Sequence, residues 1–191
     1  MIEFFKYYDR ALFLKINSSH SQFMDVIMWV VSHDFFIYPF IILFLFWHFK
    51  KASPRRALTM VLGIGFCVAT ADLSTNIVKH KVQRYRPSHN LEIMAQVHTV
   101  NDYHGGQFGF FSSHAANSFA VVTLLFLAAK TFMSNKYRYA FYLLPSFIIY
   151  SRIYLGVHYP SDVMVGAVWG ILIGWLIFNL LTRFFLKEQK S

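Results

Sequence analysis

The sequence predicts an all-α integral membrane protein, a single domain made of a bundle of five to six transmembrane helices. Of its 191 residues, 56% are hydrophobic and only 14% are charged, and the mean hydropathy is +0.42. Soluble domains carry charge on about one quarter of their residues. Long apolar runs alternate with short basic segments, so the charge marks the ends of spans. The net charge of +9 therefore indicates membrane flanks and an anion site, and no nucleic acid partner is expected.

The predicted spans are apolar runs of roughly the length that crosses a membrane, about 20 residues. Five runs qualify: residues 35–49, 57–78, 115–133, 139–157 and 163–181. The last run has no charged residue and repeats glycine every four positions, at Gly166, Gly170 and Gly174. That spacing allows a second helix to approach closely. Five such runs in so short a chain argue against the alternative, buried helices of a soluble protein.

The first 34 residues differ from the rest and leave the number of spans open. Apolar Phe5, Tyr8, Leu12 and Ile16 recur at helical spacing among charged residues, which predicts a helix lying in the membrane interface. Residues 23–31 are too short to cross alone, so they form a re-entrant turn or join the next run as one bent span. We expect residues 1–34 to be this interfacial or re-entrant region, 35–186 the helical core and 80–113 an external loop.

Orientation follows from the basic residues of the short loops, which tend to stay in the cytoplasm. Alternating spans place three basic segments on one side: Lys50, Lys51, Arg55 and Arg56; Lys130, Lys136 and Arg138; and Arg183, Lys187 and Lys190. The opposite, outer side then receives the residues of the three motifs described next. A bacterial inner membrane protein with its active site facing the periplasm or exterior is the predicted arrangement.

Three short motifs carry the residue types needed to bind and cleave a phosphate. They are Lys79-HKVQRY-Arg86-Pro87, Ser112-Ser113-His114 and Ser151-Arg152-IYLGV-His158-YPS-Asp162. Guanidinium groups match the geometry of phosphate oxygens. Two histidines can divide the roles of nucleophile and general acid, and a carboxylate four residues after the second can fix its tautomer. Lys79 and Arg86 are seven residues apart, which places them on one face of a helix that Pro87 ends.

In order and spacing, the motifs resemble those of the type 2 phosphatidic acid phosphatase family, membrane lipid phosphatases that share their phosphate site with vanadium-dependent haloperoxidases. Two positions depart from the family: Phe111 stands where it has proline, and Ser113 where it has glycine. The resemblance implies that His158 is the nucleophile, that His114 protonates the leaving oxygen and that Asp162 orients His158. The phosphate would be held by Lys79, Arg86, Ser112, Ser113 and Arg152.

The substrate is a membrane lipid phosphate, and undecaprenyl diphosphate is the favoured one, cleaved through a phosphohistidine. Lipid A and phosphatidylglycerol phosphate are alternatives, and a phosphate- or lipid-binding transporter is the non-enzyme alternative. No metal, cofactor or obligate protein partner is expected, because cationic side chains replace a divalent ion. Residues 88–111 contain acidic and histidine residues whose spacing fits no firm metal pattern: His89, Glu92, His98, Asp102 and His104. They are predicted to form a loop that caps the site.

Overall fold

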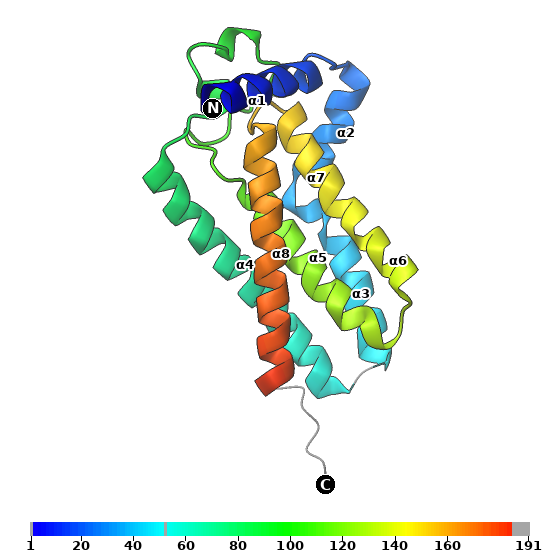
Figure 1. The fold of residues 1–191 in the computed structure, drawn as a ribbon. Coiled ribbons are helices and arrows are strands. Elements are labelled where there is room, and N and C mark those ends of the chain that lie inside the picture. Colours follow the sequence, from blue (N-terminus) through cyan, green and yellow to red (C-terminus); the bar gives the residue numbers. More distant parts are fainter. Residues whose placement is uncertain (1, 52, 185–191) are drawn as a thin grey trace.

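The computed structural model describes residues 2–51 and 53–184, and this part of the chain is built from helices (Figure 1). The α-helices are α1 Ile2–Asn17, α2 Gln22–Ser32, α3 Tyr38–Lys51, α4 Pro54–Val82, α5 Ser113–Ala128, α6 Asn135–Tyr139, α7 Leu143–Tyr154 and α8 Pro160–Phe184. Short 3-10 segments are η1 Asp34–Phe36, η2 Pro87–His89, η3 Met94–Gln96, η4 Ala129–Thr131 and η5 Ala140–Tyr142. Residues 185 and 186 of the expected core, and the basic residues Lys187 and Lys190, lie outside the described residues.

The chain runs back and forth along one bundle, and α1 lies across one end of it (Figure 1). From that end α2 and α3 lead away, α4 returns, α5 leads away, α6 and α7 return, and α8 leads away. The long segment between α4 and α5 therefore lies at the same end as α1. The basic segments at the junction of α3 and α4, around α6 and at the end of α8 lie toward the opposite end.

In the described part of the chain, three helices are long and apolar enough to cross a membrane: Pro54–Val82, Ser113–Thr131 and Pro160–Phe184. They contain all of the predicted runs 57–78 and 163–181 and most of 115–133. The segments Gln22–Ser32 and Asp34–Lys51 pass together as a pair bent by 78°, which gives up to four spans. Helices α2 and α3 lead toward the same end of the bundle. A pair bent in this way is either a broken span or a re-entrant loop, the two alternatives expected for residues 23–31.

The predicted run 139–157 is not one continuous helix. Its first residues belong to α6 and η5, and α7 ends at Tyr154. Pro145 explains the interruption, because proline has no amide hydrogen to donate to residue 141. Gly156, at φ +76°, then turns the chain away from the helix axis. This turn places His158 inside the end of the bundle. A continued α7 would have placed it beyond that end.

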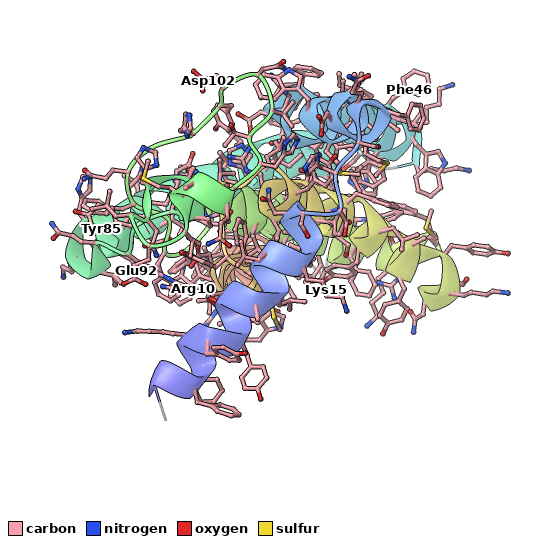
Figure 2. The ribbon with its side chains drawn as sticks, turned by 90° about the horizontal axis from the view of Figure 1, so that it is seen from above. Arg10, Lys15, Phe46, Tyr85, Glu92 and Asp102 are labelled. Carbon is pink, nitrogen blue, oxygen red and sulfur yellow. The ribbon has the colours of Figure 1, made fainter. Side chains whose placement is uncertain are left out.

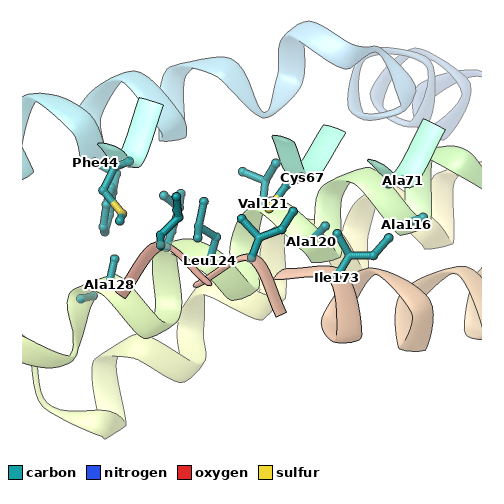
Figure 3. Close-up of a cluster of buried hydrophobic side chains, with 14 of the residues drawn as sticks. Phe44, Cys67, Ala71, Ala116, Ala120, Val121, Leu124, Ala128 and Ile173 are labelled. Carbon is teal, nitrogen blue, oxygen red and sulfur yellow. The ribbon is translucent and has the colours of Figure 1, made fainter. Parts of the chain in front are cut away.

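The closest packing in the bundle is between α8 and α5, along the glycines of α8. A methyl group on Gly166 would stand 2.6 Å from the carbonyl oxygen of Ser112, and on Gly170 it would overlap the carbonyl oxygen of Ala116. Figure 3 shows the adjoining core, in which Cys67 of α4, Val121 of α5 and Ile173 of α8 are buried together. The predicted small-residue contact is therefore present, and it brings the first turns of α5 and α8 to one level.

Helix α1 packs on the bundle through Phe13 and, of its predicted apolar face, through Ile16. Phe13 is fully buried, with its ring centroid 5.5 Å from that of Tyr159. Phe5, Tyr8 and Leu12 remain 48–65% exposed. The exposed apolar face suits a helix in the membrane interface. Seen from above, α1 passes beside the loop that carries Glu92, whose carboxylate forms a 2.5 Å ion pair with Arg10 (Figure 2).

Candidate active site

The three motifs meet where α4, α5, α7 and α8 have their ends nearest to α1. The amide of Ser112 donates to the carbonyl of Asp162 at 3.1 Å, and Lys79 Nζ donates to Ser113 Oγ at 2.5 Å. The main chain of Gly109 packs against both His158 and Asp162. Segments separated by tens of residues thus form a single site.

His158 lies at the centre of this site, immediately before α8. Its Nδ1 stands 3.5 Å from Oδ2 of Asp162, and the two side chains are 1% and 0% exposed. Asp162 Oδ2 also accepts the amide of Tyr159 at 3.0 Å, which fixes the carboxylate against the turn. With Nδ1 directed to the carboxylate, Nε2 is left for a substrate. Burial lowers the pKa of His158 well below its ordinary value, and the positive charges of Arg86 and Arg152 lower it further.

The second oxygen of Asp162 binds Arg84, which the motifs did not single out. Arg84 donates to Asp162 Oδ1 and to Asp9 of α1, both at 2.6 Å, and its guanidinium lies over the ring of Tyr159. Asp9 in turn accepts from the amide of Ser161 at 2.8 Å. The sequence did not indicate this pairing, because Asp9 is 75 positions away from Arg84.

Lys79 and Arg86 do not share a helix face, and this prediction was wrong. Helix α4 ends at Val82, and Gln83 at φ +51° reverses the chain direction. Arg86 follows in extended backbone, and Pro87 opens η2 instead of ending α4. The two cations nevertheless reach the same site, Lys79 from the helix and Arg86 from the loop.

Two buried arginines of the site, Arg86 and Arg152, have guanidinium nitrogens that the protein leaves without acceptors. Arg86 is 8% exposed and donates from Nε to the carbonyl of Phe108 at 3.2 Å. Arg152 is 2% exposed and binds the hydroxyl oxygens of Ser32 and Tyr103. Among the described residues, Arg86 Nη1 and Arg152 Nε meet no hydrogen-bond partner. Burial and the nearby charge of Arg152 lower the pKa of Arg86 to about 10, so it remains protonated at neutral pH. Unpaired buried guanidinium groups favour a bound anion.

Both serines of the second motif use their hydroxyls within the protein. Ser112 is fully buried and caps α5, accepting the amide of Ala115 at 3.4 Å. Ser113 Oγ lies between Thr75 Oγ1, at 2.8 Å, and Lys79 Nζ. The hydroxyl of Ser112, predicted to hold phosphate, is thus used as the N-cap of α5. Ser113 Oγ accepts a hydrogen bond from the ammonium group of Lys79 at the N-terminus of α5.

His114 separates a polar cavity from a mostly apolar one. Its Nε2 stands 3.3 Å from Oδ1 of Asp34, a residue that sequence analysis did not select. A cavity of about 210 Å³ lies on the side of Arg152, lined by Trp29, Ser32, His33, Asp34, Tyr103, His114 and Arg152. A second cavity, of about 320 Å³, extends from Asp34 and His114 between apolar side chains of α3, α4, α5 and α7. The site can thus accept a phosphate on one side of His114 and an apolar group on the other.

The loop that covers the site spreads its acidic and histidine residues among separate partners. His98 Nε2 lies 3.0 Å from Asp25 of α2, and His104 Nε2 lies 3.0 Å from Asp102, which Figure 2 shows at the outer edge of the loop. Across residues 2–51 and 53–184, no three His, Cys, Asp or Glu residues form a group that could hold a metal ion. Gly109 brings the end of this loop against His158.

Comparisons with known proteins agree with the motifs. The profile of the PAP2 superfamily matches residues 60–186. The lipid A 4'-phosphatase of Porphyromonas gingivalis is 31% identical over 173 residues, covering 90% of this chain and 72% of that protein. The lipid A 4'-phosphatase of Bacteroides thetaiotaomicron is 36% identical over 195 residues, covering 100% of this chain and 84% of that protein.

The fold also matches a solved structure. The transmembrane PAP2-type phosphatidylglycerolphosphate phosphatase of Bacillus subtilis superposes with a TM-score of 0.71, covering 97% of this chain and 89% of the other. Its sequence identity is 20%, so the likeness is evidence for the fold.

Proposed function

Because this chain belongs to the PAP2 superfamily and is a lipid phosphate hydrolase, we propose that it removes the 4'-phosphate of lipid A. The observation that carries this proposal is the identity with two lipid A 4'-phosphatases over 90% and 100% of the chain. It favours lipid A over undecaprenyl diphosphate, the substrate preferred from the motifs alone. The adjoining polar and apolar cavities support a phosphate attached to a large amphipathic molecule.

In the proposed reaction, His158 attacks phosphorus through Nε2 while Asp162 holds its Nδ1. The bond between phosphorus and the sugar oxygen breaks, and the proton of His114 passes to that oxygen. Water then attacks the phosphohistidine, releasing phosphate and returning a proton to His114. The support is geometric: His158 is buried beside its carboxylate, His114 is near enough to interact with it electrostatically, and His114 lines a cavity together with Arg152.

Lys79, Arg86 and Arg152 are proposed to bind the non-bridging phosphate oxygens. The free Nη1 of Arg86 and Nε of Arg152 are the strongest support, since each is a buried donor that lacks an acceptor. Charge-assisted hydrogen bonds at these positions stabilise the charge that accumulates in the transition state. The amide groups at the start of α5, where Ser112 and Ser113 lie, add the positive end of a helix dipole.

The site is proposed to face the periplasm of a bacterial inner membrane. The basic residues Lys51, Arg55 and Arg138 belong to segments at the bundle end remote from α1 and the site. Basic short segments tend to remain in the cytoplasm. This arrangement leaves α1 on the outer surface, with its exposed apolar face toward lipid.

The test is phosphate release by the purified protein from lipid A that carries both its phosphates. Undecaprenyl diphosphate and phosphatidylglycerol phosphate serve as competitors, and tandem mass spectrometry assigns the phosphate lost. We expect loss of the 4'-phosphate, unchanged activity in excess chelator, and no turnover in His158→Ala. His80→Ala, an exposed histidine of α4, is the matched control. Loss of the 1-phosphate would overturn the positional assignment, and a faster reaction with either competitor would overturn lipid A as substrate.

A further inference from the structure

Asp34 lies in η1, where the chain bends by 78° between α2 and α3. Its Oδ1 stands 3.3 Å from Nε2 of His114, and its side chain is 77% exposed. No motif includes Asp34, because it precedes His114 by a whole span and the following loop. Only the bend between α2 and α3 brings it to the start of α5.

The two histidines of the site are thus each paired with a carboxylate, but through opposite ring nitrogens. His158 uses Nδ1 with Asp162, and His114 uses Nε2 with Asp34. A carboxylate on one ring nitrogen fixes the proton there and aims the other nitrogen at its target. The surroundings of the two carboxylates differ greatly. Asp162 is fully buried, whereas the side chain of Asp34 is 77% exposed.

The charges around His114 make this carboxylate important. Lys79 of α4, Arg86 and His158 of the loops, and Arg152 of α7 all interact electrostatically with His114. Positive charges near an imidazole oppose its protonation, and a carboxylate favours it. The same two cavities are lined by four further titratable groups: His33, Tyr38, Asp72 and Tyr103. Asp72 already accepts a hydrogen bond from Asn117 at 2.8 Å.

We propose that Asp34 is a positioning residue that stabilises the protonated form of His114 and directs its Nδ1 to the leaving oxygen. The proposal rests on the general-acid role given to His114 above, and it holds for any lipid phosphate substrate. Asp34 binds the Nε2 proton, and the Nδ1 proton moves to the oxygen as its bond to phosphorus breaks. When water attacks the phosphohistidine, the proton that water releases restores His114.

The experiment compares Asp34→Asn with the unmodified protein on a lipid phosphate and on p-nitrophenyl phosphate. The second substrate has an acidic leaving group that scarcely needs protonation. We expect kcat on the lipid to fall about tenfold to a hundredfold, less than the full worth of a general acid. The fall on p-nitrophenyl phosphate should be about threefold or less, and the alkaline limb of the lipid pH profile should move to lower pH. Asp34→Glu should recover part of the loss.

Asp102→Asn is the matched control, because Asp102 is an exposed carboxylate paired with a different histidine, His104. It should leave kcat and the pH profile unchanged. Equal losses on both substrates, a change confined to KM, or an unmoved alkaline limb would overturn the role of Asp34.

A second measurement does not depend on turnover. In NMR spectra of protein with isotope-labelled histidine, the resonance that is missing from His114→Ala is assigned to His114. This resonance should titrate at lower pH in Asp34→Asn. An unchanged titration would reject the role of Asp34, whichever lipid is the substrate. Conversely, failure on lipid A with success on another lipid phosphate would reject only the substrate assignment.

Discussion

Arg84 and Asp162 form a 2.6 Å ion pair in which the carboxylate is fully buried and the guanidinium also binds Asp9 of α1. The carboxylate beside His158 is therefore held in place by a residue that also binds helix α1, which is distant from Asp162 in the sequence. An isolated buried carboxylate is costly, and removing its cation leaves that cost uncompensated. The position of α1 and the geometry of His158 are thus linked through one arginine.

Arg84→Ala should lower kcat/KM about tenfold to a hundredfold, because Asp162 loses a charged hydrogen bond and its hold on His158 weakens. Asp9→Asn should cost less, since Arg84 then keeps its bond to Asp162. Phosphate release and the apparent Tm in detergent measure both effects. The control is Lys81→Ala, an exposed neighbour. A larger loss in Asp9→Asn than in Arg84→Ala would show that the effect does not run through Asp162.

His158→Ala should reduce turnover by about ten-thousandfold, as expected when one member of a catalytic unit is removed. The side chain is buried within a packed turn, so detergent extraction and size-exclusion profiles should confirm that the variant still folds. A phosphorylated protein trapped by rapid alkaline quench from the unmodified chain should be missing from the variant. Substantial residual turnover, or label retained in the variant, would place the nucleophile elsewhere.

The acid limb of kcat/KM should lie below pH 6.5, the ordinary pKa of histidine. Burial and the cations Arg86 and Arg152 lower the pKa of His158, so the neutral, nucleophilic imidazole persists as pH falls. Arg86→Gln removes one of these cations and should move the limb to higher pH. The difference between variant and unmodified protein cancels the ionisation of the substrate. Movement to lower pH would contradict the electrostatic role of Arg86.

Membrane sidedness can be tested with single cysteines in a background in which Cys67 is replaced. Leu91 is 88% exposed in the loop over the site, and Ser53 and Ser134 are exposed near the basic segments. A membrane-impermeant thiol reagent on intact cells with a permeable outer layer should label position 91 and spare positions 53 and 134. The reverse pattern would place the site in the cytoplasm.

Several features of the site could be predicted because they depend on near neighbours in sequence. His158, Pro160 and Asp162 occupy one turn, so their spacing alone predicts a helix start with the carboxylate facing the imidazole. The prediction for Lys79 and Arg86 failed for a local reason. It assumed that α4 continues to Pro87, whereas Gln83 takes a left-handed conformation and ends the helix four residues earlier.

The sequence by itself determined the membrane class, the long apolar helices α4, α5 and α8, and the order of the phosphate motifs. Helices in lipid satisfy their own backbone hydrogen bonds, so composition and local spacing are sufficient to predict them. Only the tertiary structure decided which charges meet. Asp9 reaches Arg84, and Asp34 reaches His114, because α1 crosses the bundle end and the bend after α2 turns inward. Such pairings depend on how distant helix ends pack together, and spacing along the chain does not encode that packing.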